Sequence, residues 1–228
     1  MITWSDFWHA LWLSLVVSGL ATLIGAVLGL SLGTVLAEYE FRGRGAVLAV
    51  VHAFMGLPPV VVGVFTFAVI ARSGPLGSLG LVYTPAAMVV VQVVLATPII
   101  TGFTYASLTD VDPRLALQAR SLGATRTQAM VVKAREARAG LVAAVIAGFG
   151  RVIAEVGAVT IVGGAINERT DTLTTLAVKL TRLGRSNMAM LVGLVLIAIA
   201  LVVNVFLTRL QSDRGAREAE KKVTGYVG

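Results

Sequence analysis

The chain has 228 residues, of which 57% are hydrophobic and only 14% are charged, and its mean hydropathy is +0.87. A soluble domain of this size is about 45–50% apolar and about 25% charged, so the composition predicts an all-α integral membrane protein. The net charge of +7 is scattered between apolar segments, which argues against nucleic acid as a partner. With no cysteine, disulfides, thiolate metal sites and thiol nucleophiles are excluded.

Five apolar segments are long enough to cross a bilayer, which takes about 20 helical residues. In chain order they are approximately Trp8–Ala37, Val47–Ala71, Thr84–Leu108, Leu141–Val162 and Met188–Thr208. The first is longer than a straight span needs, which indicates a tilt or an interfacial end. Aromatic residues gather at its start, at Trp4, Phe7, Trp8 and Trp12, as in the aromatic belt of membrane proteins.

The basic residues are distributed unevenly over the connecting segments. With the N-terminus placed outside, 13 of the 19 Lys and Arg residues fall on the inner side, 5 fall on the outer side, and Arg151 lies within a span. Those on the inner side lie within residues 42–44, 114–138 and 209–222. Because cytoplasmic loops carry an excess of Lys and Arg, the pattern predicts an outer N-terminus and an inner C-terminus. Residues 1–210 are then the transmembrane domain, and residues 211–228 are a cytoplasmic polar tail.

The first span carries small residues at every fourth position, at Ala21, Gly25, Gly29 and Gly33. Such a pattern lets a second helix approach closely. Contact with another helix of the same chain is the simpler interpretation, and contact with a second copy is the alternative.

Proline interrupts the second and third spans. Proline lacks an N–H, so it frees a carbonyl and kinks a helix. Two adjacent prolines, Pro58 and Pro59, predict a break in the second span, and broken helices at membrane depth often line a cavity. We therefore regard Pro58 and Pro59 as candidates for the lining of a pathway, and Pro98 of the third span as a residue of shape alone.

A polar, basic segment of about residues 110–140 separates the third and fourth spans. Within it, Pro113 predicts the start of a short helix and Gly123 its end. The bilayer cannot hold such a helix, and the segment is too short to form a soluble domain. We therefore predict that it docks a partner protein. A second short helix is expected on the outer side, around Leu173–Leu183.

Arg151 and Glu155 lie four residues apart in the fourth span, so they share one face of a helix and can pair. Arg151 lies about 15 Å from the start of that span, near the middle of the bilayer. Charges at this depth are costly and often mark a functional site. A structural ion pair and a place on a transport pathway both remain open.

Several kinds of chemistry have no support in the sequence. His9 and His52 lie far apart, without a carboxylate at ligand spacing, so no metal site is predicted. No glycine-rich phosphate-binding loop occurs, so the chain does not hold ATP itself. No hydrolase motif of the common designs occurs either. We therefore predict no catalytic residue and no cofactor.

Four stretches resemble permease subunits of type I ABC importers, and the resemblance covers roughly Trp8–Leu210. The docking segment resembles their coupling loop, with Ala119, Arg120, Leu122, Gly123 and Ala124 at the matching positions. Phe149–Ala158 is similar to the Arg-x-x-x-Glu-x-Gly segment of oxyanion permeases for sulfate, molybdate and tungstate. His52–Gly63 and Val156–Gly164 look most like the tungstate branch.

The resemblance implies a type I ABC importer permease fold in the cytoplasmic (inner) membrane. It also implies a homodimer, an ABC ATPase that docks at the five coupling-loop residues, and an extracytoplasmic binding protein that delivers tungstate. Molybdate or sulfate is the alternative substrate. A stand-alone channel or secondary carrier is the rival class, although carriers usually show two related halves and none is visible here. An intramembrane enzyme would need a catalytic pair that the sequence lacks.

Overall fold

The computed structural model describes the backbone of residues 4–224 and the side chains of residues 4–205. Within that range the secondary structure is helical and includes no strand. The helices, in chain order, are α1 (Trp4–Glu38), α2 (Arg44–Met55), α3 (Pro59–Ile70), the short 3₁₀ helix η1 (Gly77–Leu79), α4 (Pro85–Thr109), α5 (Pro113–Ser121), α6 (Arg126–Glu136), α7 (Arg138–Ile153), α8 (Gly157–Gly163), α9 (Leu173–Arg182) and α10 (Ser186–Thr224).

Three described helices are long and apolar enough to cross a bilayer unaided, namely α1, α4 and the part of α10 up to Val205. Two bent pairs pass the same test together: α2 with α3, bent by 106°, and α7 with α8, bent by 60°. Counting each bent pair as one span gives five, with ends close to those expected. The prediction of an all-helical membrane protein is therefore confirmed.

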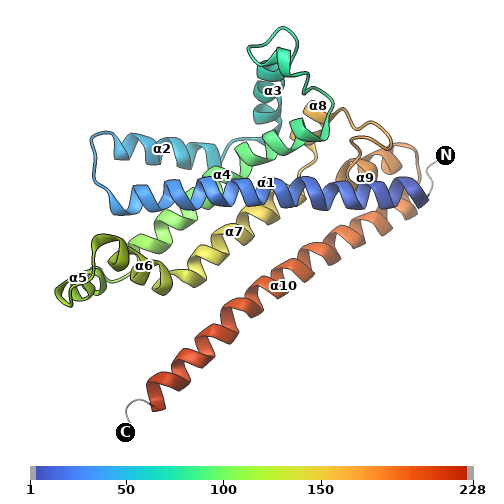
Figure 1. Cartoon of the computed structure of the whole chain (residues 1–228). Coiled ribbons are helices and arrows are strands. Elements are labelled where there is room, and N and C mark those ends of the chain that lie inside the picture. Colours follow the sequence, from blue (N-terminus) through green and yellow to red (C-terminus); the bar gives the residue numbers. More distant parts are fainter. Residues whose placement is uncertain (1–3, 225–228) are drawn as a thin grey trace.

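Helices α1 and α4 cross (Figure 1), and Gly25, Gly29 and Gly33 of α1 face α4 of the same chain. A Cβ atom added to Gly29 would lie 2.7 Å from the Cβ of Ile100, and one added to Gly33 would lie 2.6 Å from the Cβ of Thr104. Real Cβ atoms do not approach so closely, so glycine is what allows the two helices to touch. The interpretation of the ladder as contact within one subunit is confirmed.

The break that the two prolines predict is present between α2 and α3. Pro58 has an extended backbone (φ −60°, ψ 127°), and Pro59 is the first residue of α3. A residue before proline is driven out of the helical region, which ends α2 and turns the chain. As a result α3 stands away from the bundle (Figure 1). By contrast, α4 runs through Pro98 without interruption.

The expectation of one continuous fourth span was wrong. Helix α7 ends at Ile153, and the short helix α8 begins only at Gly157. The half-span α8 packs against α3: a Cβ added to Gly157 would lie 2.7 Å from a methyl carbon of Val60, and one added to Gly63 would lie 2.7 Å from the Cα of Ala158. The segments that follow the two breaks therefore lie side by side.

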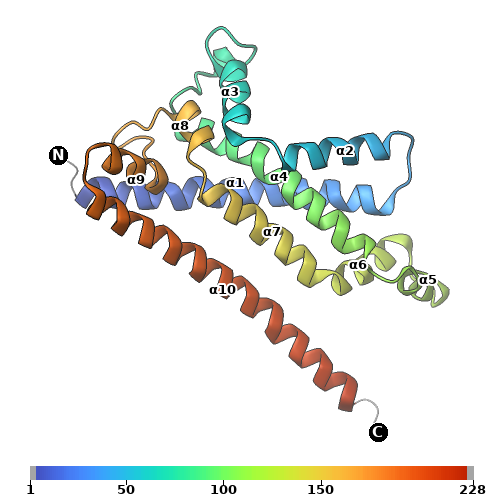
Figure 2. The same ribbon diagram turned by 180° about the vertical axis from the view of Figure 1, so that it is seen from behind.

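The two ends of the bundle differ in what they carry. Helices α5 and α6 lie at one end, whereas α9 lies at the other end beside the start of α1 (Figures 1 and 2). The observed α9 agrees with the short outer helix predicted around Leu173–Leu183. Helix α10 begins beside α9, runs toward the α5 end, and continues past the expected domain boundary at residue 210 as far as Thr224.

Candidate functional site

The predicted docking helix is α5, and local chemistry fixes both of its ends. The Asp112 carboxylate accepts a hydrogen bond from the backbone N–H of Arg114 at 2.8 Å, which caps the first turn. Gly123 takes a left-handed conformation with φ 90°, and there the chain leaves the helix. The N–H of Ala124 then donates to the carbonyl of Ala119 at 3.0 Å, so the candidate coupling residues form one closed turn.

The tip of this turn is open to its surroundings. Leu122 is 89% exposed and Leu117 is 64% exposed, although both are apolar. Arg120 and Gly123 are also exposed, whereas Ala119 and Ala124 are half-buried. Large exposed apolar side chains on a polar segment indicate a surface that another protein covers. The geometry therefore agrees with docking, while the contacts themselves remain a prediction.

Helix α6, for which the sequence analysis made no prediction, follows α5 directly. A reciprocal capping box starts it: the Thr125 hydroxyl accepts from the N–H of Gln128 at 3.3 Å, and the Gln128 side chain accepts from the N–H of Thr125 at 2.8 Å. The signal was present as a Thr-x-x-Gln pattern, which is a helix-start signature. Because α6 is the main neighbour of α5 within the described chain, α5 and α6 form one hairpin.

The hairpin is fastened to the end of α1. The Lys133 ammonium lies 2.6 Å from the Glu38 carboxylate, and both side chains are largely buried. The Arg126 guanidinium donates to the backbone carbonyl of Glu38 at 3.2 Å and lies 4.4 Å from the centroid of the Tyr39 ring. These contacts join residues about ninety positions apart, so no local pattern predicts them. A displacement of α5 would therefore reach the long helix α1 through α6.

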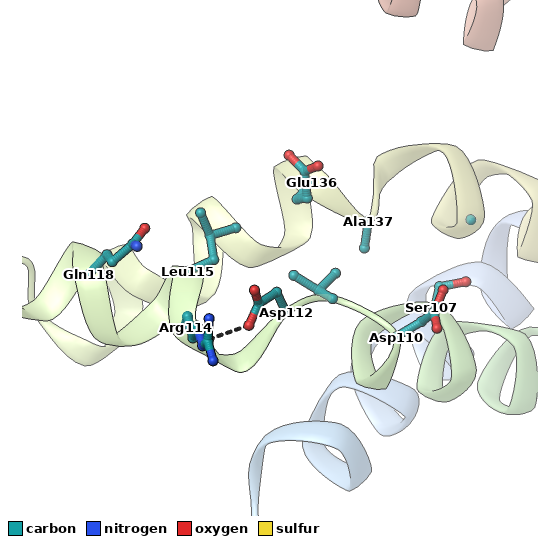
Figure 3. Close-up of a pocket in the computed structure, with 10 residues that line it drawn as sticks. Ser107, Asp110, Asp112, Arg114, Leu115, Gln118, Glu136 and Ala137 are labelled. Carbon is teal, nitrogen blue, oxygen red and sulfur yellow. Dashed lines mark hydrogen bonds between the residues drawn. The ribbon is translucent and has the colours of Figure 1, made fainter.

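A cleft of about 550 Å³ lies behind α5. Figure 3 shows Gln118 of α5, Glu136 at the end of α6 and Ser107 of α4 around it. Asp110 and Asp112 add two more carboxylates, but no group of His, Cys, Asp and Glu in the described residues has the arrangement of a metal site. The cleft separates α5 from the body of the bundle, so α5 is held by α6 and by its connecting turns.

The Arg151–Glu155 pair forms as predicted, but at the α7–α8 break rather than on one continuous helix. The guanidinium donates to one Glu155 oxygen at 2.8 Å. The other Glu155 oxygen accepts from the N–H of Ala158 at 3.0 Å and so caps α8. The Thr174 hydroxyl donates to the Glu155 carbonyl at 2.9 Å. The Glu155 side chain is only 5% exposed, whereas that of Arg151 is 30% exposed.

The four residues proposed for a pathway come together in one region. Pro58 and Pro59 lead into α3. The next residue, Val60, contacts Gly157, which lies two residues after Glu155 in the sequence. The structure thus brings two breaks, about a hundred residues apart in sequence, to the same place. Backbone breaks at membrane depth are tolerated where protein or a water-filled cavity satisfies their polar groups. A role of these residues in transport stays a prediction.

Comparison with known proteins gives a consistent result. Residues 25–213 match the family model described as "Binding-protein-dependent transport system inner membrane component". A "probable anion ABC transporter permease protein" of Haloferax volcanii is 37% identical over 90% of each chain. A tungstate uptake system permease of Peptoclostridium acidaminophilum is 36% identical over 89% of each chain.

Among solved structures, an inward-facing form of the MetNI methionine ABC transporter matches with a TM-score of 0.74 and 21% identity. The match covers 92% of this chain and 97% of that one, so the two chains share the type I ABC importer permease fold. The family model spans most of the sequence, including α5 and the Arg151–Glu155 pair. The chain therefore belongs to the binding-protein-dependent inner membrane components, the multi-pass permease subunits of ABC importers.

Proposed function

We propose that this permease imports an oxyanion, tungstate first, as a homodimer with two ABC ATPase subunits and an extracytoplasmic binding protein. The assignment of the substrate rests on similarity to a tungstate permease and an anion permease, which are 36–37% identical to this chain over about nine tenths of its length. ATP hydrolysis belongs to the ATPase subunit in this proposal. Molybdate and sulfate are the alternative substrates.

In this proposal α5 enters a cleft of the ATPase. Its exposed Leu122 tip and its capped ends give a rigid, partly apolar knob of the kind that a protein groove covers. The Lys133–Glu38 ion pair and the Arg126 contacts would then carry the closing of the ATPase from the α5–α6 hairpin to α1. The hairpin would also act on α7 directly, because α6 ends at Glu136 and α7 begins at Arg138.

The anion would meet Arg151. A guanidinium has five N–H donors, and one nitrogen of Arg151 is engaged by Glu155. The partly open side chain thus has donors left for an oxyanion, whose geometry suits a planar guanidinium. Glu155 offsets the positive charge, which keeps an anion from binding so tightly that it cannot leave.

The second permease copy would cover α3. This helix stands out from the bundle, and its residues Val60, Val61, Val64 and Phe65 are exposed and apolar. A closed twofold dimer buries one such patch against its own equivalent. The proposed pathway would then lie between the two copies, next to both helix breaks.

Gly123→Val is expected to give an inserted, assembled permease that no longer activates its ATPase. Valine is a poor residue at φ 90°, since its branched side chain clashes with the backbone there. Space is not the cause, because nothing lies within 4 Å of a Cβ at this position. Gly123→Asn is the matched control, since asparagine tolerates this conformation. Substrate-dependent ATPase activity of the assembled complex is measured, and wild-type activity in the valine variant would remove this turn from coupling.

The topology predicts opposite labelling of two engineered cysteines. The chain has no cysteine of its own, so Thr125→Cys and Glu168→Cys each report one position. Thr125 begins α6 at one end of the bundle, and Glu168 lies in the loop before α9 at the other end. A membrane-impermeant maleimide applied to intact cells should label Cys at 168 and spare Cys at 125. The reverse pattern would invert the proposed orientation.

The substrate is tested on the complete complex in liposomes. The binding protein, loaded in turn with tungstate, molybdate or sulfate, is added, and ATPase activity and anion uptake are measured. We expect tungstate to stimulate both at the lowest concentration. A lower half-maximal concentration for molybdate or sulfate would reassign the substrate. Uptake that continues without the ATPase subunit would instead favour a channel or secondary carrier.

A further inference from the structure

An apolar groove of about 560 Å³ lies at the end of the bundle that carries the N-terminus. Trp4 and Phe7 of α1, Leu176 and Leu180 of α9, and the Met188–Ala198 face of α10 form its walls. The lining side chains are aliphatic or aromatic, and the indole N–H of Trp4 is the one side-chain donor among them, so the groove offers little to a polar solute. It lies against α10, in which Val192 is the one buried residue between Ser186 and Val205, so this stretch presents most of its apolar surface to its surroundings.

The length of the groove matches one leaflet of a membrane. Its wall on α10 runs from Met188 to Ala198, which at 1.5 Å per residue is about 15 Å. The hydrocarbon core is about 30 Å thick, so each leaflet is about 15 Å deep. Trp4 is 79% exposed at the mouth, where an indole ring suits the headgroup level. The groove thus has the depth and chemistry of a site for an acyl chain.

Two arginines belong to the connection between α9 and α10, which follows the groove residue Leu180 and precedes the groove residue Met188. Arg182 ends α9, and Arg185 lies in the tight turn to α10; both are exposed, and neither has an ion-pair partner within residues 4–205. The backbone N–H of Arg185 donates to the carbonyl of Leu180 at 2.9 Å, which holds the turn against the wall of the groove. The neighbouring Lys179 differs, since Asp171 neutralises it at 3.2 Å.

We propose that the groove binds one acyl chain of an anionic phospholipid, whose phosphate lies against Arg182 and Arg185. A planar guanidinium engages phosphate oxygens through two parallel hydrogen bonds, and two exposed arginines without an ion-pair partner in the adjoining α9–α10 connection supply the complementary charge. A second copy of the chain fits this face less well. A twofold axis here would set Arg182 and Arg185 against their own equivalents, and like charges placed together weaken association.

The site is independent of the transported substrate and of the proposed ATPase contacts. Its occupant is a component of the surrounding membrane rather than the cargo, and the groove uses none of the residues assigned to coupling or to the pathway. A negative result for lipid binding therefore leaves the proposed import function untouched. A negative result for import likewise leaves the lipid site untouched.

Trp4 provides a reporter inside the groove. The chain has three tryptophans, at positions 4, 8 and 12, so the Trp8→Phe/Trp12→Phe background leaves Trp4 alone. This variant of the full permease is placed in vesicles of unlabelled phosphatidylcholine. In one series an increasing fraction of the lipid is brominated phosphatidylglycerol, and in the other it is brominated phosphatidylcholine, both with bromine on the acyl chains. Bromine quenches tryptophan fluorescence on contact. We expect the brominated phosphatidylglycerol to quench half-maximally at about a fivefold lower fraction, since two basic residues attract the anionic lipid.

Two further variants separate the contribution of the lipid headgroup from that of the acyl chain. Arg182→Gln/Arg185→Gln should bring the phosphatidylglycerol curve onto the phosphatidylcholine curve. Arg72→Gln, which removes an exposed basic residue from the loop after α3, should leave the preference unchanged. Ala198→Phe fills the inner end of the groove and should reduce quenching by both lipids.

Three results would overturn the proposal. Equal quenching by both lipids in the reporter background would remove the headgroup site. A preference that survives the double arginine substitution would place the headgroup elsewhere. Absence of quenching by either lipid, together with a disulfide between two copies carrying Leu191→Cys, would show that a second copy covers the groove.

Discussion

Gly29→Val is expected to prevent α1 from seating on α4 and to lower the amount of folded permease in the membrane sharply. The new Cβ alone would lie 2.7 Å from the Cβ of Ile100 and 3.0 Å from the backbone carbonyl oxygen of Thr97. Overfilling a packed interior costs about 1–3 kcal/mol, and more where backbone must move. Because α4 presents backbone at this contact, we expect a loss at or above the top of that range.

The measurement is the melting temperature of the purified protein in detergent, together with its level in the membrane. Gly19→Val on the same helix is the matched control, since no atom lies within 4 Å of a Cβ at that position. It carries the same change in composition and helix propensity without the clash. Similar melting temperatures for the two variants would mean that the close approach of α1 and α4 does not stabilise the fold.

Arg151→Met should destabilise the permease more than Glu155→Gln does. Removing one partner of a buried pair is costly, typically about 3–5 kcal/mol, because it leaves the other charge uncompensated. Glu155 is the more deeply buried partner, so the charge left by Arg151→Met has less access to water. Glutamine at position 155 also keeps an oxygen that can accept from the N–H of Ala158, which preserves the cap of α8.

The double variant decides between the two roles of the pair. If the residues are coupled, the stability losses of the two single variants add up to more than the loss in the double variant, by about 0.5–3 kcal/mol. Melting temperatures and anion uptake are measured on all four proteins. A stable but inactive double variant assigns the pair to the pathway, whereas a stable and active one assigns it to the scaffold. Strictly additive losses would contradict the 2.8 Å contact between the side chains.

Local chemistry made several elements predictable. Pro113 and Gly123 bound α5 in the sequence, and the same residues start the helix and release the chain from it in the structure. The double proline predicted the α2–α3 break because a proline acts on its own helix and on the residue before it. The four-residue spacing of Arg151 and Glu155 also predicted their pairing, although Glu155 lies just beyond the last residue of α7.

Contacts between distant segments were not predictable. The α7–α8 break depends on Glu155 capping α8 and on Thr174, which comes from another helix, bonding the Glu155 carbonyl. The attachment of α6 to α1 depends on Lys133 and Glu38, which are 95 residues apart. The same holds for the lipid-facing groove, whose three walls come from both ends of the sequence.

By itself the sequence determined the membrane class, the approximate spans, the ends of α5 and the family, because composition, periodicity and short motifs act within one or two turns of a helix. The tertiary structure decided where the fourth span breaks, which glycines lie against a neighbouring helix and which charges from distant segments meet. The physical reason is that these depend on what a neighbouring helix presents. The four-residue spacing already set Gly29 apart from Gly19 in the sequence, but only the structure shows that Ile100 of α4 lies opposite Gly29.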